Sequence, residues 1–199
     1  TFAAAIPAII SGGIAERSKF WTQAFAAAIF VGVTYPLFEG MVWGQITLLG
    51  QEGSWLTELT DGVPFHDYAG SVVVHSMGGW IALTAVIVLG PRLGRWDSQG
   101  RSRPIPISNV PFMALGSWML CVGWFGFNVG SELAADGTAG LVMINTQVAT
   151  AAAVLGWITM EWVTRGKPSM LGGASGAIVG LVAITPACAV VGPMGAILL

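Results

Sequence analysis

Charged residues are scarce in this sequence, and this scarcity sets its class before any motif is considered. Only 9% of the residues are Asp, Glu, Lys or Arg, whereas 54% are hydrophobic and the mean hydropathy is +0.74. Soluble domains carry about 25% charged residues, so the composition excludes an ordinary soluble protein and predicts a chain embedded in a lipid bilayer. The formal net charge of −2 is too small to indicate a nucleic-acid partner.

Cysteine and histidine are also rare, with two residues of each. Cys121 and Cys188 lie within apolar runs, where a free thiol behaves as a small hydrophobic residue, and their spacing matches no metal or redox motif. We interpret both as packing residues and expect neither a metal site nor a cofactor. No nucleophile, base and orienting group lie at matching depths in the predicted spans, so an enzyme is the least favoured class.

Long apolar runs, by contrast, fill most of the chain. A helix needs roughly 20 apolar residues to cross a bilayer, and five segments approach that length: residues 20–45, 69–90, 110–131, 140–162 and the shorter 170–187. The opening TFAAAIPAIISGGIAE lacks an initiating Met and a basic n-region, so it does not resemble a signal peptide. We interpret this opening stretch and the closing GAILL as partial spans. The predicted fold class is all-α: a polytopic transmembrane helix bundle, of which the chain is an internal part with about five full spans and two partial ones.

The basic residues segregate to one face of this arrangement. All eight lie in loops that share one face if the spans alternate: Arg17, Lys19, Arg92, Arg95, Arg101, Arg103, Arg165 and Lys167. The opposite face receives seven of the ten acidic residues: Glu39, Glu52, Glu58, Asp61, Asp67, Glu132 and Asp136. Because cytoplasmic loops carry the excess of Lys and Arg, we predict that the basic loops are cytoplasmic and the acidic loops lie outside.

This topology places Phe2, Trp43, Phe127, Ser131 and Thr185 at a similar level near the outer surface. One interpretation is the aromatic belt that anchors membrane proteins at the interface. The other is an outer vestibule, in which aromatic faces attract a cation and Ser131 adds a hydrogen-bond acceptor. Topology alone leaves both interpretations open.

His75 lies deeper, inside the apolar run of DYAGSVVVHSMGGW. A helix that begins near Ala69 rises about 1.5 Å per residue and carries His75 roughly 9 Å inward. Ionisable residues at such depth usually face the bundle interior and indicate a substrate or proton pathway. The alternative is a neutral histidine that is hydrogen-bonded to a neighbouring helix.

Six stretches of the sequence resemble successive blocks of the ammonium transporter family, whose animal relatives are the Rhesus proteins. In order, they are TFAAAIPAIISGGIAERSKF, MVWG, DYAGSVVVHSMGG, GWFGFNVGS, INTQVATAAAVLGWITMEW and RGKPSMLGGASGAIVGLVAITPAC. The resemblance implies about eleven transmembrane helices per subunit, a homotrimer with a pore through each subunit, and an inverted repeat whose junction falls near residues 91–109. Residues 1–199 would then be a partial ammonium transporter domain, incomplete at both ends.

The resemblance also implies roles for individual residues. It assigns ammonium recruitment to Trp43, Ser131 and Phe2, and the stacked aromatic gate to Phe2 and Phe127. His75 matches the first of two pore histidines that bind ammonia or relay its proton. The second histidine would lie beyond these 199 residues.

Three further residues are implied in supporting roles. Asp67 matches a buried acid that organises the recruitment region, although a simple helix N-cap would also explain it. Trp124 matches an aromatic near the gate, and Thr185 matches a hydroxyl near the vestibule. His66 matches no family role and is expected to be a solvated loop residue.

The function implied is transmembrane transport of ammonium or ammonia in the plasma membrane, and in a bacterium in the inner membrane. Ammonium would be recruited at the aromatic vestibule, deprotonated and passed through an apolar pore lined by histidine. A cytoplasmic PII-type regulator of the full-length protein is a further implied partner. Two alternatives stay open: an ammonium sensor coupled to signalling, and a Rhesus-type gas channel, against which Trp43 argues.

Two further features concern the ends of spans: one departure from the family pattern and one pair of opposite charges. Family members often follow the Trp with a run of glycines, whereas here Gly44 precedes Gln45 and an acidic loop, so the vestibule rim is expected to differ. Glu161 stands four residues before Arg165, a spacing that favours an ion pair on one helix face, and we interpret this pair as structural.

Overall fold

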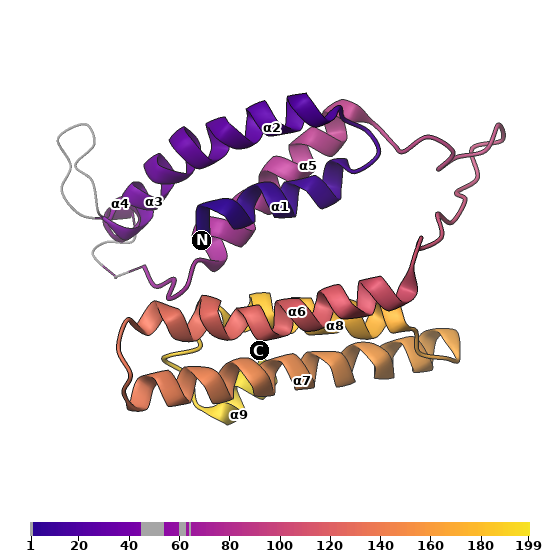
Figure 1. The fold of residues 1–199 in the computed structure, drawn as a ribbon. Coiled ribbons are helices and arrows are strands. Elements are labelled where there is room, and N and C mark those ends of the chain that lie inside the picture. Colours follow the sequence, from indigo (N-terminus) through magenta and orange to yellow (C-terminus); the bar gives the residue numbers. More distant parts are fainter. Residues whose placement is uncertain (1, 45–53, 60–62, 64) are drawn as a thin grey trace. The chain divides into compact units, whose positions relative to one another are not determined.

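The computed structural model describes residues 2–44, 54–59, 63 and 65–199, with the side chains of Thr57 and Glu58 excepted. Gln45, Glu52 and Asp61 therefore lie outside the described residues. Helices dominate the described part of the chain (Figure 1). Two compact units are present: the first comprises residues 1–66 and 72–106, and the second comprises residues 67–71 and 107–199.

In the described residues of the first unit, four α-helices follow the N-terminus and a fifth precedes the loop that carries Arg92 and Arg103. They are α1 (Phe2–Ile14), α2 (Phe20–Ile29), α3 (Tyr35–Trp43), α4 (Trp55–Leu59) and α5 (Met77–Leu89). α1 packs along α5 (Figure 1). Ile6, Ile10 and Ile14 recur every fourth residue on α1 and are at most 9% exposed, because this spacing puts them on one helix face.

π-helical turns interrupt two of the predicted spans of the first unit. Phe30–Thr34 joins α2 to α3, and the Tyr35 N–H donates to the carbonyl of Phe30, five residues back. Pro36 follows at once and has no N–H for the carbonyl of Gly32, so the regular ladder cannot continue there. A second π-helical turn, Ser71–Ser76, leads directly into α5 and contains His75.

The second unit is built on three longer helices and two short ones. They are α6 (Val110–Asn128), the 3₁₀ turn η3 (Val129–Glu132), α7 (Gly137–Arg165), α8 (Met170–Ile184) and α9 (Pro193–Leu198). α7 and α8 pack along one another (Figure 1). A buried cluster joins Val142 and Ala149 of α7, Ile184 of α8, Ala196 of α9 and Cys188, so Cys188 packs as a core residue, as predicted.

Capping residues fix the ends of these helices. The side chains of Asn109, Asp136 and Ser169 accept hydrogen bonds from backbone N–H groups in the first turns of α6, α7 and α8, which satisfies donors that lack helical partners. α8 ends at Ile184, three residues short of the predicted span end, because Pro186 cannot donate the next helical hydrogen bond.

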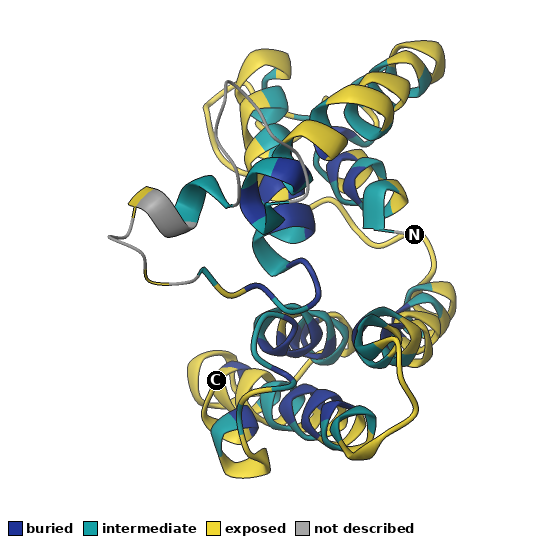
Figure 2. Ribbon diagram, turned by 90° about the vertical axis from the view of Figure 1, so that its left-hand side faces the viewer, coloured by how far each residue is buried: buried dark blue, intermediate teal, exposed yellow. Residues whose placement is uncertain are grey.

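Four helices of the described chain are long and apolar enough to cross a membrane: Phe20–Trp43, Ser71–Leu89, Val110–Glu132 and Gly137–Arg165. α1 and α8 are apolar but shorter. Most of the surface of these helices is exposed, and buried residues line only their inner faces (Figure 2). Trp21 at 81% and Val163 at 79% exposure are examples of large apolar side chains that a bilayer or further helices would cover.

Candidate functional site

The Trp43 indole lies at the end of the α2–α3 span and contacts Phe2. Gly44 adopts a left-handed conformation with φ of 68° and ends the helix directly after Trp43; a residue with a Cβ would be strained there. The ring centroids of Phe2 and Trp43 are 6.2 Å apart with an interplanar angle of 46°. Two residues with predicted recruitment roles therefore contact one another within the first unit.

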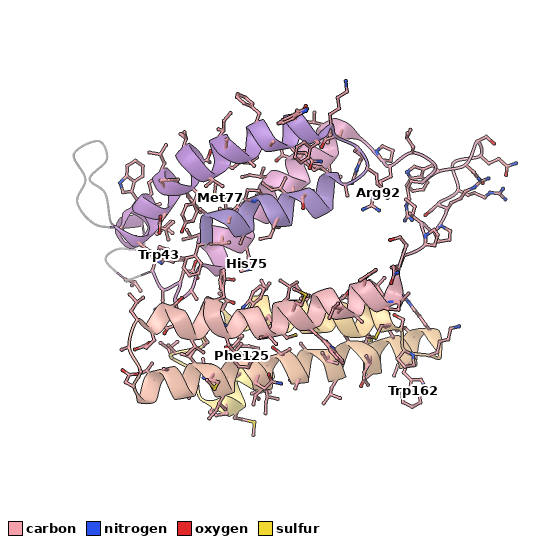
Figure 3. The ribbon with its side chains drawn as sticks, viewed as in Figure 1. Trp43, His75, Met77, Arg92, Phe125 and Trp162 are labelled. Carbon is pink, nitrogen blue, oxygen red and sulfur yellow. The ribbon has the colours of Figure 1, made fainter. Side chains whose placement is uncertain are left out.

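His75 stands one turn inside the helix that runs from Ser71 to Leu89 and is half-buried. Figure 3 shows Trp43 and His75 toward the same end of the first unit and Arg92 toward the other end. Val73 and Val74 beside it are fully buried. His75 thus lies on a π-helical turn next to two buried valines, and such turns are frequent at functional sites.

Asp67 caps the helix that carries His75. Its Oδ1 accepts hydrogen bonds from the backbone N–H groups of Gly70 at 3.1 Å and Ser71 at 2.7 Å. The residue is 4% exposed, and a carboxylate is favoured at the positive end of the helix dipole. The capping interpretation is confirmed, while the organising role stays a prediction.

A tyrosine beside Asp67 joins two chain segments of the second unit. The Tyr68 hydroxyl donates to Glu132 Oε2 at 2.5 Å, and the Tyr68 N–H donates to the Pro186 carbonyl at 3.2 Å. Burial and the Glu132 carboxylate raise the pKa of the Tyr68 phenol above its ordinary value, so the phenol remains a donor at neutral pH. This contact positions the loop from which the Asp67 cap begins.

Trp124, Phe127 and Thr185 are brought together in the second unit. The ring centroids of Trp124 and Phe127 are 5.2 Å apart at an interplanar angle of 33°. The Trp124 indole N–H donates to Thr185 Oγ1 at 2.9 Å. The two rings are therefore held against α8 at the residue that follows its last turn.

Ser131 has a hydroxyl whose proton is already committed. Ser131 Oγ donates to the Phe127 carbonyl at 2.8 Å, four residues back. A hydroxyl has one donor and two acceptor lone pairs, so Ser131 can offer only an acceptor to a ligand. That polarity suits a ligand that carries N–H groups.

The predicted residues are distributed over both units. Phe2, Trp43 and His75 belong to the first unit, while Phe127 and Ser131 belong to the second. The stacked gate of Phe2 on Phe127 and the pairing of Trp43 with Ser131 stay predictions. Among the described residues, no group of three or more His, Cys, Asp or Glu side chains is placed to hold a metal ion.

Sequence reasoning missed a set of buried polar residues near the Trp124–Phe127 pair. Asn128 and Asn145 are fully buried, and Thr146 is 1% exposed. Asn145 Nδ2 donates to the carbonyls of Cys188 at 2.8 Å and Val191 at 2.7 Å. The available signal was the presence of amide side chains within apolar spans, where a polar group needs a partner.

Membrane-length helices with polar side chains buried between them define a multi-pass α-helical membrane protein. The whole chain, residues 1–199, matches the model of the ammonium transporter family. The chain therefore belongs to the ammonium transporter family.

Individual relatives agree with this assignment. The ammonium transporter Amt2 of Archaeoglobus fulgidus is 42% identical over 199 residues, which are 100% of this chain and 42% of that protein. A solved structure titled Sensor Amt Protein matches with a TM-score of 0.89 at 38% identity, over 99% of this chain and 47% of that one. Mep2 of Saccharomyces cerevisiae matches with a TM-score of 0.82 at 29% identity, over 99% of this chain and 42% of that one. The chain thus spans less than half the length of these proteins.

Proposed function

We propose that the full-length protein moves ammonium or ammonia across the plasma membrane, in a bacterium the inner membrane, as a homotrimer with a pore in each subunit. Family membership supports this substrate. The observation that carries the proposal is the chemistry of the two aromatic pairs, Phe2–Trp43 and Trp124–Phe127, with an acceptor hydroxyl at Ser131. Aromatic faces and a lone pair recognise a small cation that donates hydrogen bonds.

Recruitment begins at the outer, acidic face. Ammonium is desolvated against Trp43 and Phe2, and Ser131 accepts one of its N–H groups. A cation–π contact contributes about 0.5–2 kcal/mol, more as water is excluded. The aromatic faces thereby replace part of the lost hydration before the substrate passes the gate at Phe127.

Beyond the gate the proton and the ammonia part. A full charge inside the apolar region costs about 2.5–3.5 kcal/mol or more, whereas neutral ammonia carries no such cost. His75 is half-buried beside fully buried valines, and a neutral imidazole offers one donor and one acceptor. It can bind ammonia or relay the released proton without holding a permanent charge.

The test is ammonium-evoked current from the full-length protein in liposomes, normalised to folded trimer, for wild type and His75 variants. If His75 relays protons, His75→Asn and His75→Gln lose most of the current, because an amide does not titrate near neutral pH, and His75→Glu recovers part of it. His66→Asn is the matched control, since His66 is exposed in a loop. Equal currents in wild type and His75→Asn would return His75 to a packing role.

A second arm of the same assay examines recruitment. Trp43→Leu is expected to weaken discrimination against potassium by about two- to thirtyfold, the equivalent of one cation–π contact. The control is Trp21→Leu on the same span, where the indole is 81% exposed. Unchanged potassium competition in Trp43→Leu would remove Trp43 from the recruitment site.

An ammonium sensor is the second candidate, and the match to the structure titled Sensor Amt Protein favours keeping it. A sensor binds ammonium through the same vestibule but need not conduct it. Methylammonium uptake by cells that lack their own transporters separates the two. Binding to the purified protein without uptake would favour the sensor. If the full-length protein is a transporter, we propose a cytoplasmic PII-type regulator as its partner. The sensor hypothesis includes no such partner.

A further inference from the structure

A continuous chain of side-chain hydrogen bonds lies behind the Trp124–Phe127 pair in the second unit. The Trp124 indole N–H donates to Thr185 Oγ1 at 2.9 Å, and Thr185 Oγ1 is 3.3 Å from Asn128 Oδ1. Asn128 Nδ2 donates to Thr146 Oγ1 at 3.1 Å. Asn128 and Thr185 are 0% exposed, Thr146 is 1% exposed and Trp124 is 7% exposed. The chain is therefore buried along its whole length.

The donors and acceptors in this chain run in one direction. The indole N–H can only donate, so the Thr185 hydroxyl accepts from it. The single Thr185 proton is shared between the Leu181 carbonyl at 2.7 Å and Asn128 Oδ1. Thr146 in turn accepts from Asn128 and donates to the Val142 carbonyl at 2.7 Å. Each threonine hydroxyl thus donates to a carbonyl of its own helix and accepts a hydrogen bond from a side chain of α6.

The chain joins three helices at the level of the aromatic pair. Trp124, Phe127 and Asn128 lie three and four residues apart on α6, which places them on one helix face. Thr146 belongs to α7, and Thr185 is the residue after the last turn of α8. The indole is consequently fixed at its nitrogen by α8 and along its face by Phe127, so its rotation is restricted.

Packing alone does not require this arrangement. α7 and α8 already approach closely, since a Cβ at Gly180 would lie 2.6 Å from Ala153 Cβ. Replacing both partners of a buried hydrogen bond by apolar groups of the same shape can be nearly neutral or stabilising. Valine has nearly the shape of threonine and would fill positions 146 and 185 without a hydroxyl. A satisfied polar network instead specifies a unique geometry.

We propose that Asn128 and Thr146 are positioning residues for the Trp124–Phe127 pair, acting through Thr185, and that they set how selectively this pair admits a cation. This inference rests on the proposed function, because Phe127 is one of the two residues of the proposed aromatic gate and Trp124 contacts it. Asn128 orients the Thr185 hydroxyl, Thr146 holds the Asn128 amide, and the indole ring receives its orientation from both.

The experiment uses the full-length protein and replaces one polar side chain at a time by an apolar one of the same branching and number of heavy atoms. The variants are Thr185→Val, Asn128→Leu and Thr146→Val, with Thr185→Ser and Thr146→Ser as rescues that keep the hydroxyl. Two quantities are measured per folded trimer: the half-saturating ammonium concentration of the current and its competition by potassium. We expect each apolar variant to raise the half-saturating concentration and to weaken potassium discrimination by about three- to tenfold, the equivalent of one buried hydrogen bond. The serine variants should remain near wild type.

The matched control is Thr150→Val. Thr150 lies on α7, as Thr146 does, and is 7% exposed. Its hydroxyl donates to the Thr146 carbonyl at 2.7 Å. It therefore tests the loss of a buried threonine hydroxyl outside the chain that reaches the indole. A double variant, Thr185→Val with Asn128→Leu, tests the order of action. If Asn128 acts through Thr185, the double variant should match Thr185→Val alone.

Each outcome decides the proposal. Variants that lower the amount of folded protein but leave half-saturation and potassium competition unchanged in the remaining trimers would overturn it, as would shifts equal to those of Thr150→Val. If wild type carries no current, the proposed transport function fails. The same variants are then compared by calorimetric titration of methylammonium, where unchanged affinity would also overturn the positioning role.

Discussion

The helix pairs α1–α5 in the first unit and α7–α8 in the second are held together by different means. Between α1 and α5, a Cβ at Gly78 would come 3.1 Å from Ile9 Cβ, a contact that an adjustment of a few tenths of an ångström between the helices relieves. Between α7 and α8, a Cβ at Gly180 would lie 2.8 Å from the Ala149 carbonyl oxygen. Backbone cannot give way as a side chain can, so the second pair depends on its glycines.

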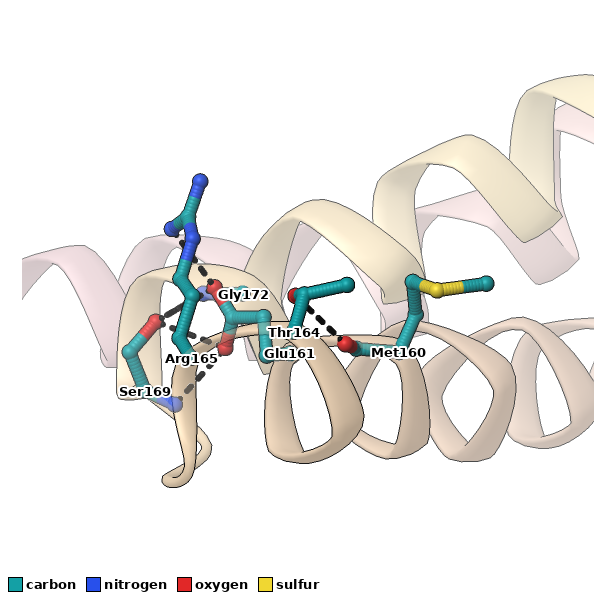
Figure 4. A network of polar contacts seen from close by, with 6 residues as sticks. All are labelled: Met160, Glu161, Thr164, Arg165, Ser169 and Gly172. Atoms are coloured by element: carbon teal, nitrogen blue, oxygen red, sulfur yellow. Dashed lines mark hydrogen bonds and ion pairs between the residues drawn. The ribbon is translucent and has the colours of Figure 1, made fainter.

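The same contrast appears where these pairs end at the predicted cytoplasmic face. In the first unit, the Arg17 guanidinium donates to the carbonyls of Gly13 and Gly90, near the C-termini of α1 and α5. In the second unit, the Glu161 carboxylate accepts from the N–H of Ser169 at 2.8 Å and from its hydroxyl at 3.0 Å, at the N-terminus of α8 (Figure 4). A cation thus holds two helix C-termini and an anion holds a helix N-terminus, as the helix dipoles favour.

Two helix pairs of one membrane protein can therefore be held together by side-chain contacts in one case and by backbone contacts in the other. α1 and α5 meet through a stripe of isoleucines, which tolerates small changes in volume. α7 and α8 meet through backbone contact and polar ties that tolerate few. We therefore expect the second unit to be the more sensitive to substitution.

The largest expected effect comes from adding a methyl group at Gly180. Gly180→Ala should destabilise the full-length protein by about 1–3 kcal/mol, since overpacking forces α7 and α8 apart, although alanine is the better helix former. Gly78→Ala in the first unit should cost less, because its nearest contact would be 3.1 Å, whereas Gly180→Ala would meet Ala153 Cβ at 2.6 Å. Melting temperature in detergent is the measurement.

The control for this pair is Gly173→Ala, whose Cβ would meet Ile158 Cγ2 at an ordinary 3.9 Å. It should be neutral or stabilising. Equal losses for Gly180→Ala and Gly78→Ala would remove the distinction between the two interfaces.

The next effect concerns Glu161, which is 7% exposed although it carries a carboxylate. Glu161→Gln replaces one acceptor oxygen by a donor, so at least one of the hydrogen bonds from Ser169 is lost. We expect a clearly lower melting temperature. Arg165→Gln should change it little, because Arg165 is 74% exposed at 3.5 Å from the carboxylate, and exposed ion pairs contribute little. A greater loss for Arg165→Gln would make the ion pair, and not the cap, the main tie.

Much of this fold could be predicted from hydropathy. The segments 110–131 and 140–162 agree closely with α6 and α7, because a bilayer imposes length and apolarity on each span. The end of α8 was misplaced because apolar residues continue past Ile184 and only Pro186 breaks the helix. The π-helical turn that carries His75 leaves no signature in hydropathy, since side-chain polarity does not report which carbonyl an N–H selects.

The candidate site shows the same limit. Family resemblance located Trp124 and Thr185, and the structure joins them by a hydrogen bond. The resemblance could not indicate that Asn128 and Thr146 extend this contact, because their hydrogen bond joins two helices and two residues that are 18 positions apart in the sequence. The Glu161–Arg165 pair was predicted from its spacing and is present, but the tighter bonds to Ser169 were missed because they cross a turn.

A smaller effect is expected for a second pair with the same spacing, Asp97–Arg101, which lies in a loop of the first unit. It is a dependence of the stability of this turn on pH. The Asp97 carboxylate accepts from the N–H and side chain of Arg101 and from the N–H of Gln99. These bonds, the Arg101 N–H foremost, lower the pKa of Asp97 below its ordinary value of 3.8. A lowered pKa stabilises the folded turn above 3.8, and the stabilisation is lost as the pH falls through the lowered pKa.

Amide hydrogen exchange of residues 95–103 in the full-length protein measures this loss. Protection should be constant from neutral pH down to the ordinary aspartate range and then decline with acidification. Asp97→Asn should show weaker protection with no such decline. A decline that begins well above 3.8 would assign the pH dependence to another group.

The smallest expected effect is a gain in stability at two non-glycine residues that have positive φ in the part of the chain that the structure describes. Leu133 in the second unit has φ of 56° and Glu16 in the first has φ of 64°, a conformation that costs residues with a Cβ about 1 kcal/mol. Leu133 is also 93% exposed, so Leu133→Gly removes strain and loses almost no packing. Glu16→Gly relieves the same strain but gives up a 3.9 Å ion pair with Arg92. We expect both variants to melt slightly higher than wild type, with the larger gain for Leu133→Gly. A lower melting temperature for Leu133→Gly would show that this leucine is covered by another part of the full-length protein, which would add a packed contact to the second unit and sharpen its contrast with the first.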